Sequence, residues 1–490
     1  MDVMKKVFFV FFVFSVFSVF SVSSVSSVFS VSSVFAQTVH ILSVNDIHAT
    51  IEKMPQLAAL VDSLRQEDPE LIVLSAGDNR TGNPVNDRHA TPGLPMLEMM
   101  NKIGFNASAL GNHEFDSKIE GLRTIVNEAK FKHLCCNIYA PDSMRLHTYP
   151  YMFLEAHGVK IGVLGTLAIN SLGIPDCHPN NVIGVKFRQP DEVIPEYRWM
   201  KDQCDVMILL SHDGYKEDIQ TAEKYPWLDM IIGGHSHTKV DGELHNGVFI
   251  TQAQNKLKYA TLITIRGVQG EFQWSSKLIP LDKSLPSGGD LEEAITQMIS
   301  AYSDNPFLQE VVTEVSSPFL TTEELGNMEM DALLAETGAD VAIQNGGGVR
   351  FSSFPAGPMT VMDVLKLDPF GNDAVMYEMT GQEIADFIMN DYNIDMHQTV
   401  FVGGITYDMQ VNSVTGDAES IKIKMPDGSK FDLKKKYRMV TNSYAASIST
   451  SKKSDQGKSL FRPCSDFVID WLRSQSTIFY TGSRRAVINR

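Results

Sequence analysis

Between about residues 38 and 280, short apolar runs of strand length alternate with longer amphipathic stretches of helix length. The apolar runs predict strands, and the amphipathic stretches, with apolar residues three or four positions apart, predict helices. This alternation is typical of a sheet covered by helices, so we expect one α/β unit here. The first members of the series are VHILSV (39–44), PQLAALVDSLRQ (55–66), LIVLSAGD (71–78), LPMLEMMNKIG (94–104) and NASALGN (106–112).

The alternation stops at a turn-rich segment, SLPSGGD (284–290), which is followed by LEEAITQMIS (291–300). We predict a domain boundary here and a helix with Asp290 as its N-cap. A chain of 490 residues is also too long for one ordinary core. The predicted organisation is a first domain at 37–282, a linker and connecting helix at 283–305, and a second domain at 306–490.

The second half again mixes helical and strand-like patterns, without an internal repeat that relates it to the first. The predicted fold class is therefore α/β in both domains, the second being the smaller. Helices are expected at 328–337 and 381–391, and strands at 340–344, 399–411 and 437–442.

The first 36 residues have a composition of their own. Lys5 and Lys6 precede a long run of Phe, Val and Ser that ends at Val34-Phe35-Ala36. This pattern is typical of a secretory signal peptide that is cleaved next to small residues. The alternative is a retained membrane anchor, which the many serines make less apolar than a spanning helix. We therefore predict a periplasmic or secreted protein with no stable membrane anchor after cleavage.

Removing residues 1–36 leaves 40 basic and 58 acidic residues, a net charge of −18. This charge argues against a nucleic-acid polymer as partner, because such binding needs a field of Lys and Arg. An anionic small molecule would need local positive charge, which bound metal ions supply. Five cysteines without C-x-x-C spacing predict neither a disulfide framework nor a thiolate metal site. Whether Cys177 and Cys204 pair is left open, as is the oligomeric state.

Aspartate, asparagine and histidine residues repeatedly follow the predicted strands of the first half. In open α/β sheets the carboxyl ends of the strands present the functional groups. Residues i and i+2 of an extended chain point to one face, so Asp46 with His48, and His235 with His237, are each expected to meet at one ion. Imidazole and carboxylate ligands together favour Zn, Mn or Fe. The candidate metal ligands are Asp46, His48, Asp78, Asn112, His212, His235 and His237.

Two divalent ions at about 3.5 to 4 Å need a shared anion, and Asp78 in GDN is the predicted bridge. Such a pair of ions activates a bound water and neutralises phosphoryl oxygens. His113 and Asp116 of GNHEFD are not among these candidate metal ligands. A carboxylate can orient the imidazole, whose other nitrogen then stabilises the phosphoryl group or protonates the leaving oxygen. We therefore predict that His113 and Asp116 are catalytic.

The ordered set D-x-H, GD-N, GNHE-x-D, H and GH-x-H resembles the calcineurin-like metallophosphoesterase superfamily. The resemblance implies a four-layer α/β/β/α sandwich with two metal sites. It assigns Asp46, His48, Asp78 and His237 to site one. Site two takes Asp78, Asn112, His212 and His235. His113 and Asp116 match the catalytic pair of the family.

Three further segments, QNGGGVR (344–350), PFGN (369–372) and YRMVTNSY (437–444), resemble the second domain of secreted 5'-nucleotidases and periplasmic UDP-sugar hydrolases. The resemblance implies a substrate site between two domains that rotate against each other. Arg350 would meet the phosphate, and Phe401 and Tyr444 would sandwich the base. From the residues alone, the glycine run is also compatible with a tight turn, and both aromatics with core packing. The candidate substrate residues are Asn345, Gly347, Arg350, Phe401 and Tyr444.

The chain departs from this family in two places. The GGDG that commonly follows the last aromatic is absent, and no arginine lies between Arg350 and Arg438. We expect removal of the 5'-phosphate of a nucleotide by attack of a metal-bound hydroxide, giving nucleoside and phosphate outside the cytoplasm. The alternatives are hydrolysis of a UDP-sugar or a 2',3'-cyclic nucleotide, or a non-catalytic metal-containing binding protein.

Overall fold

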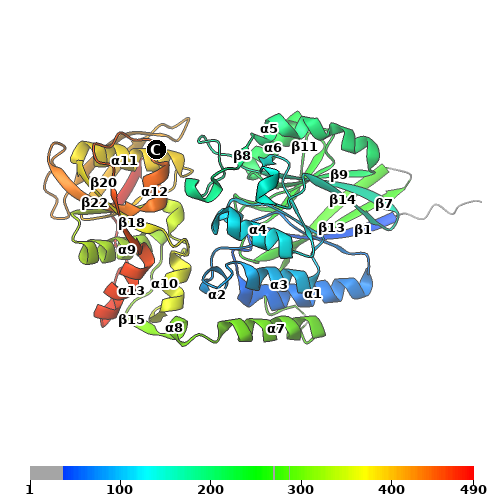
Figure 1. The fold of residues 1–490 in the computed structure, drawn as a ribbon, viewed down its shortest axis with the longest axis horizontal. Coiled ribbons are helices and arrows are strands. Elements are labelled where there is room, and N and C mark those ends of the chain that lie inside the picture. The colour runs from blue at the N-terminus through cyan, green and yellow to red at the C-terminus, as the bar shows by residue number, and fades with distance from the viewer. Residues whose placement is uncertain (1–36, 269–270, 286, 490) are drawn as a thin grey trace, which may run out of the picture.

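The computed structural model describes residues 37–268, 271–285 and 287–489, so the predicted signal peptide lies outside the described residues. The chain forms two lobes, and helix α7 (Asp290–Ser303) runs beside the first lobe toward the second (Figure 1). Within the described ranges, no helix is long and apolar enough to cross a membrane.

The first lobe contains two six-stranded sheets that pack face to face. The apolar layer between them takes side chains from both sheets, such as Ile41, Leu74, Val163 and Ile208. In spatial order the first sheet is β14 (Glu271–Pro280), β13 (Tyr259–Val268), β1 (Gln37–Val44), β2 (Ile72–Ser75), β3 (Ala107–Ala109) and β4 (Lys132–Leu134). The second is β11 (Lys239–His245), β12 (Val248–Ala253), β10 (Met230–Ile232), β9 (Val206–His212), β7 (Val159–Leu167) and β6 (Tyr151–Ala156).

Helices cover the outer faces of both sheets, so the four-layer α/β/β/α arrangement is confirmed. Helices α1 (Met54–Glu67) and α3 (Leu94–Ile103) lie on the first sheet, and α7 packs on these two helices. On the second lie α6 (Tyr215–Lys224) and the 3-10 helix η5 (Ile194–Gln203). The N-cap of α7 is Gly289, so the prediction for Asp290 was wrong by one residue. Asp290 is the first residue of the helix, where its negative charge interacts favourably with the positive N-terminal end of the helix dipole.

The second lobe is built around the sheet β19 (Phe401–Gly403), β16 (Val341–Gln344), β22 (Lys436–Asn442), β18 (Asp373–Thr380) and β23 (Lys458–Pro463). Two smaller sheets complete it: β17 (Gly357–Thr360), β15 (Val311–Val315) and β24 (Thr477–Ile478); and β21 (Ala418–Lys424), β20 (Thr406–Val411) and β25 (Ala486–Asn489). Its helices are α8 (Pro306–Gln309), α9 (Thr322–Thr337), α10 (Val361–Leu367), α11 (Gly381–Ile394), α12 (Ser443–Ile448) and α13 (Cys464–Ser474).

One predicted strand of the second lobe is in fact two. The run 399–411 divides into β19 and β20, which belong to different sheets. Gly404, between them, has φ +75°, a left-handed conformation that ends the first strand and redirects the chain. Periodicity alone could not detect this break, because both strands are rich in buried apolar residues.

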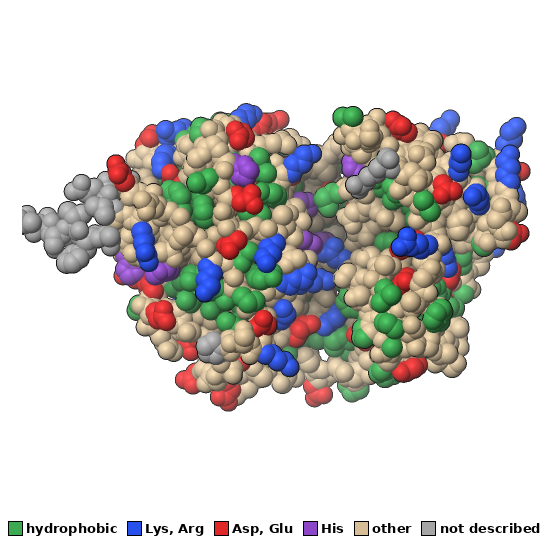
Figure 2. All heavy atoms as spheres, turned by 180° about the vertical axis from the view of Figure 1, so that it is seen from behind, with side chains coloured by type: hydrophobic (Ala, Val, Ile, Leu, Met, Phe, Trp, Pro, Cys, Tyr) green, Lys and Arg blue, Asp and Glu red, His purple; other side chains and the backbone are tan. Residues whose placement is uncertain are grey.

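Polar contacts join the lobes beside the groove that Figure 2 shows between them, where His, Lys and Arg side chains gather. Lys256 Nζ of the first lobe donates to the carbonyl oxygen of Arg350 at 2.8 Å. Lys366 Nζ of the second lobe lies 2.9 Å from Glu52 Oε1. These contacts hold the two lobes close at the end of the sheets where the candidate site residues lie.

Candidate metal centre and active site

The candidate metal ligands lie at the carboxyl ends of parallel strands, as expected from the sequence. Strands β1, β2 and β3 run parallel in one sheet, and β9 and β10 in the other, so their ends meet at one edge of the sandwich. The backbone there is unusual, with φ between 47° and 72° at Asp46, His48, Asp78, His235 and His237. Left-handed φ is costly for these residues, and strain of this kind concentrates at functional sites.

Among the described residues, three groups of side chains could hold a metal ion: two consist entirely of predicted ligands, and the other is His48, Asp78 and His113. Asp46, His48 and His237 form the first; the Nε2 atoms of the two histidines are 3.0 Å apart, and Asp46 Oδ1 is 3.4 Å from His237 Nε2. Asp78, His212 and His235 form the second, with Asp78 Oδ2 at 3.2 Å from His212 Nε2. Asp78 Oδ2 also lies 4.0 Å from His48 Nε2 of the first group.

The pair His235 and His237 does not converge on one ion, which corrects the expectation from i, i+2 spacing. The two side chains belong to different groups, because the chain after β10 is left-handed at both residues rather than extended. Asp46 and His48 do share a group, with His48 Nε2 at 3.9 Å from Asp46 Oδ1. Their backbone is left-handed as well, so the i, i+2 argument reached the right pairing for the wrong reason.

Hydrogen bonds made by the Nδ1 atoms orient the rings of His212 and His48 with Nε2 toward the site. His212 Nδ1 donates to the carbonyl oxygen of Ala76 at 2.6 Å, and His48 Nδ1 to that of Thr81 at 3.2 Å. Their Nε2 lone pairs then face the site, as in metal-binding histidines. Two buried atoms in the site, His212 Nε2 and Asn112 Oδ1, have no hydrogen-bond partner among the described residues. Such atoms fit metal ligands, since an unpaired buried polar atom is otherwise costly.

The charges in the site depend on each other. Burial disfavours ionised Asp78, but His212 and His113 hold the pKa of its carboxyl well below the usual range. Burial likewise disfavours charged His212, yet the carboxylate of Asp78 raises its pKa to about 10. Burial and the charge of Arg350 lower the pKa of His48 well below its usual value. A cation that binds here would therefore meet an ionised carboxylate at Asp78.

His113 and Asp116 lie beside both groups, on the 3-10 helix η2 (Asn112–Phe115) and directly after it. His113 Nδ1 is 2.8 Å from Asp116 Oδ2, and its Nε2 is 4.0 Å from Asp78 Oδ2. The ring of Phe370, from the second lobe, stacks on His113 with 5.6 Å between ring centroids. The hydrogen bond to Asp116 and the stacking of Phe370 thus fix the imidazole, with Nε2 directed into the site.

Two buried side chains that the sequence did not single out hold the ligand loops. Glu114 accepts hydrogen bonds from the backbone N–H of Asp78, Asn79 and Gly111 at 2.6 to 3.0 Å. Gln252 donates to the carbonyl oxygen of Gly234 at 2.7 Å, beside His235. Glu114 lies within the GNHEFD motif, so the motif could have identified it as a residue of the site. Gln252 lies within the apolar strand β12 and offered no such sign.

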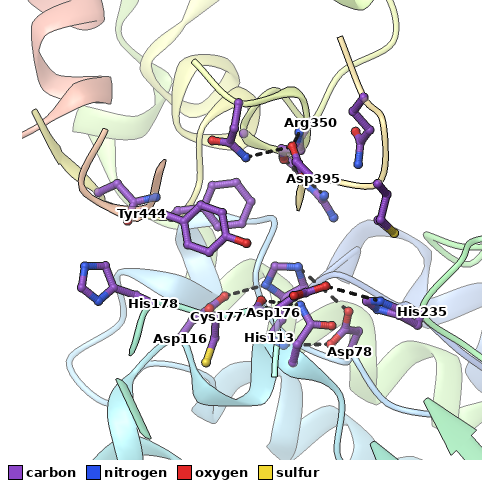
Figure 3. A pocket seen from close by; sticks show the side chains of 18 of the residues that line it. Asp78, His113, Asp116, Asp176, Cys177, His178, His235, Arg350, Asp395 and Tyr444 are labelled. Atoms are coloured by element: carbon purple, nitrogen blue, oxygen red, sulfur yellow. Dashed lines mark hydrogen bonds and ion pairs between the residues drawn. The ribbon is translucent and has the colours of Figure 1, made fainter. Parts of the chain in front are cut away.

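Arg350 and its neighbours in the second lobe complete the site on the side opposite the first lobe. Arg350 is half-buried: its Nη2 donates to His48 Nε2 at 3.2 Å, and its guanidinium lies over the ring of Phe370. Asn345 and Gly347 line the same cavity, which measures about 320 Å³ and opens between the lobes. Figure 3 shows Arg350 and Asp395 facing Asp176, His113 and Asp78 across it.

Phe401 does not line this cavity, which corrects its predicted contact with a base. Its side chain is 4% exposed and packs in the core, where its ring fills the space above Gly326 of α9. Tyr444 does line the cavity, and it lies in helix α12 rather than in a strand. Phe370 of the PFGN segment also lines it; the segment was noticed, but the ring was not assigned.

Replacing Phe401 with alanine is expected to destabilise the protein by roughly 3 to 5 kcal/mol, because it leaves a cavity against α9. Urea unfolding followed by fluorescence measures this loss. Activity per folded molecule should stay at the wild-type level, because the ring does not reach the cavity. An unchanged unfolding midpoint together with weaker substrate binding would contradict this position for Phe401.

The cavity also takes residues from a loop of the first lobe that carried no signal in the sequence. Asp176, Cys177, His178 and Asn181 all line it. The carbonyl oxygen of Asp176 accepts a hydrogen bond from Asn112 Nδ2 at 3.0 Å, which ties the loop to the metal groups. Cys177 and Cys204 are both free thiols, so they do not pair.

The chain is similar to known proteins over most of its length. Its residues 39–239 match the family model of calcineurin-like phosphoesterases, and residues 293–450 match that of the 5'-nucleotidase C-terminal domain. Protein UshA of Yersinia enterocolitica is 28% identical over 478 residues, which cover 83% of this chain and 85% of that protein. A 5'-nucleotidase of Vibrio cholerae is 30% identical over 422 residues, or 71% of this chain and 74% of that one. The crystal structure of a 5'-nucleotidase precursor from Thermus thermophilus has a TM-score of 0.81 and 23% identity, covering 92% of this chain and 99% of that chain.

The sandwich fold and its clustered carboxylates and imidazoles define a metal-dependent phosphoester hydrolase. More particularly, the chain belongs to the family of 5'-nucleotidases that join a calcineurin-like phosphoesterase domain to a 5'-nucleotidase C-terminal domain.

Proposed function

We propose that the protein hydrolyses the 5'-phosphate of a nucleotide at two divalent ions, held by Asp46, His48, Asp78 and His237 and by Asp78, Asn112, His212 and His235. The observation that carries the proposal is the shared position of Asp78 between two ligand groups, next to a cavity that both lobes line. The ligand set suits Zn, Mn or Fe. When bound, such ions would lower the pKa of a water and neutralise phosphoryl oxygens.

The side chains around the groups have separate tasks in this proposal. Arg350, at 3.2 Å from His48 Nε2, binds a phosphoryl oxygen. His113, oriented by Asp116, donates a proton to the leaving oxygen. Water adds to phosphorus, the bond from phosphorus to O5' breaks, and nucleoside and inorganic phosphate result. Asn345 and Gly347 shape the phosphate end of the cavity.

Tyr444 is proposed to pack against the base. Its ring reaches into the cavity beyond His113 and Asp116 (Figure 3), where a leaving group attached to the phosphate would lie. Stacking on one aromatic face is tolerant of base identity, so Tyr444 alone does not select a particular base. Export from the cytoplasm is also part of the proposal and rests on the sequence of residues 1–36.

Purified mature protein with added Mn²⁺ or Zn²⁺ tests the proposal on a panel of AMP, UMP, a UDP-sugar and a 2',3'-cyclic nucleotide. We expect phosphate release to be fastest from the nucleoside monophosphates. Metal-loaded protein that cleaves none of the four compounds would instead support a binding protein. Cleavage of the UDP-sugar to UMP and sugar 1-phosphate, or of the cyclic nucleotide to a nucleoside monophosphate, followed by chromatography and without phosphate release from AMP or UMP, would keep the chemistry and change the substrate.

Replacing Tyr444 with alanine is expected to raise KM for AMP about 5-fold to 100-fold, because base stacking contributes about 1 to 3 kcal/mol. Hydrolysis of ribose 5-phosphate, which has no base, should change little. Tyr444→Phe keeps the ring and serves as the matched control. Equal losses on AMP and ribose 5-phosphate would show that Tyr444 acts through the fold rather than through the base.

A further inference from the structure

A short segment of the first lobe, residues 254–257, directly follows strand β12 and contacts both the first ligand group and the second lobe. Its backbone is left-handed at Gln254, Lys256 and Leu257, with φ of 67°, 50° and 48°. Strained backbone of this kind persists only where the surrounding structure fixes it. The contacts that fix this segment lie on two sides.

On one side, two polar contacts join the segment to the first ligand group. The backbone N–H of Lys256 donates to the carbonyl oxygen of Asp46 at 2.7 Å. The side chain of the preceding residue, Asn255, places its Nδ2 at 3.0 Å from Nδ1 of His237. The position of Lys256 is therefore tied to the positions of the candidate ligands Asp46 and His237.

On the other side, the side chain of Lys256 crosses to the second lobe. Its Nζ donates to the carbonyl oxygen of Arg350 at 2.8 Å and lies 5.9 Å from the centre of the Phe351 ring. The backbone N–H of Arg350 donates to the carbonyl oxygen of Leu367, in the second lobe, at 2.9 Å. Both polar groups of the Arg350 backbone are thus fixed, one by each lobe, and the guanidinium extends from this point to His48.

Arg350 supplies the positive side-chain charge of the cavity wall. Among the described residues that line the cavity, it is the one Lys or Arg. Lys256 is not one of the lining residues, so it can act on a bound phosphate through Arg350 rather than by contact. Burial and the charge of Arg350 lower the pKa of Lys256 to about 8, so the side chain is largely charged at pH 7.

We propose that Lys256 is a positioning residue, which ties Arg350 to the first ligand group across the lobe boundary and so sets the guanidinium where a phosphoryl oxygen binds. This inference rests on the proposed function, in which Arg350 binds the phosphate. Without the Lys256 donor, the backbone of Arg350 would be held from the second lobe alone. The guanidinium would then sample more orientations, and the loss would fall on phosphate binding rather than on the ions.

The first test replaces Lys256 with methionine, which keeps an apolar stem of similar length but removes the donor. At pH 7 and fixed free metal, KM for AMP should rise about tenfold while kcat stays within about threefold, because a hydrogen bond from a charged donor is lost. The dissociation constant of inorganic phosphate, measured by calorimetry on metal-loaded protein, should rise by about the same factor. Inhibition by adenosine, which has no phosphate, should not change.

A double-variant cycle separates the positioning of Arg350 from a general effect on the fold. Arg350→Met alone should lower kcat/KM for AMP about 100-fold. Adding Lys256→Met to it should cost less than about twofold more, because the residue through which Lys256 acts is gone. Lys256→Arg keeps a charged donor and should recover most of the loss in KM. Lys130→Met, which removes an exposed lysine, is the matched control and should behave like the wild type.

Three results would overturn the inference. The first is a Lys256→Met protein whose KM and phosphate binding stay within about twofold of the wild type, and the second is a full loss of about tenfold in the Arg350→Met background. The third is loss of metal from Lys256→Met, which would make the lysine a support of the ligand loop. If Lys256→Met folds poorly, the shorter and neutral Lys256→Gln is measured in its place. A wild type that binds phosphate but releases none from AMP would instead refute the proposed function.

Discussion

Replacing Asp78 with asparagine is expected to remove metal from both ligand groups and to lower kcat/KM for AMP roughly 10⁴-fold, on the order of 5 kcal/mol. The carboxylate lies 3.2 Å from His212 Nε2 and 4.0 Å from His48 Nε2, so one substitution affects both groups. Asparagine still accepts the hydrogen bond from the backbone N–H of His113, which spares the loop.

Metal content per chain, measured by mass spectrometry, is the readout that separates this effect from unfolding. The matched control is Asp202→Asn, a change of the same kind at an exposed residue that pairs with Arg198 on the surface. It should keep both metal and activity. An Asp78→Asn protein that holds two ions and turns over normally would rule out the bridge.

Replacing His113 with alanine is expected to lower kcat about 10²-fold to 10⁴-fold while both metals remain bound. Geometry alone leaves a second possibility, because His113 with His48 and Asp78 also forms a group that could hold an ion. We favour proton donation, since His113 Nδ1 is committed to Asp116 and its Nε2 faces the cavity. Loss of metal in the variant would instead make His113 a ligand.

Comparing two substrates with different leaving groups tests the proton-donating role of His113 directly. A p-nitrophenyl leaving group needs less protonation than a nucleoside O5', so the variant should lose less activity on p-nitrophenyl phosphate than on AMP. Asp116→Asn keeps a hydrogen-bond partner for Nδ1 without its charge, and its loss should be smaller than that of His113→Ala. Equal losses on both phosphoesters would argue against a role as proton donor.

The sequence predicted that the candidate ligands lie at strand ends, because each follows a strand whose apolar run is visible on its own. VHILSV before Asp46, and VMILLS before His212, mark strands β1 and β9, and the parallel packing of such strands brings their ends together. The i, i+2 spacing put His235 and His237 at one ion, whereas the family resemblance assigned them to different sites, and the structure groups them separately. His235 and His237 separate because of left-handed backbone, which no periodicity records.

The aromatic and acidic residues of the cavity show most clearly what could not be predicted from the sequence. Phe401 and Phe370 are both aromatic residues in apolar surroundings, and only the packing of Phe401 on Gly326 and of Phe370 on His113 distinguishes core from site. Asp176 and Asp395 come from loops of different lobes, more than 200 positions apart, and the sequence gives no sign that they share a cavity.

By itself, then, the sequence determined the class of fold, and it predicted two α/β halves and the residue types of the candidate metal groups, because these follow from local hydrophobic patterns and from ligand chemistry. Tertiary structure decided the backbone conformation that separates His235 from His237, and which aromatic side chain lines the cavity. Those features depend on backbone conformation at strand ends and on contacts between lobes, which bring together residues that are distant along the chain.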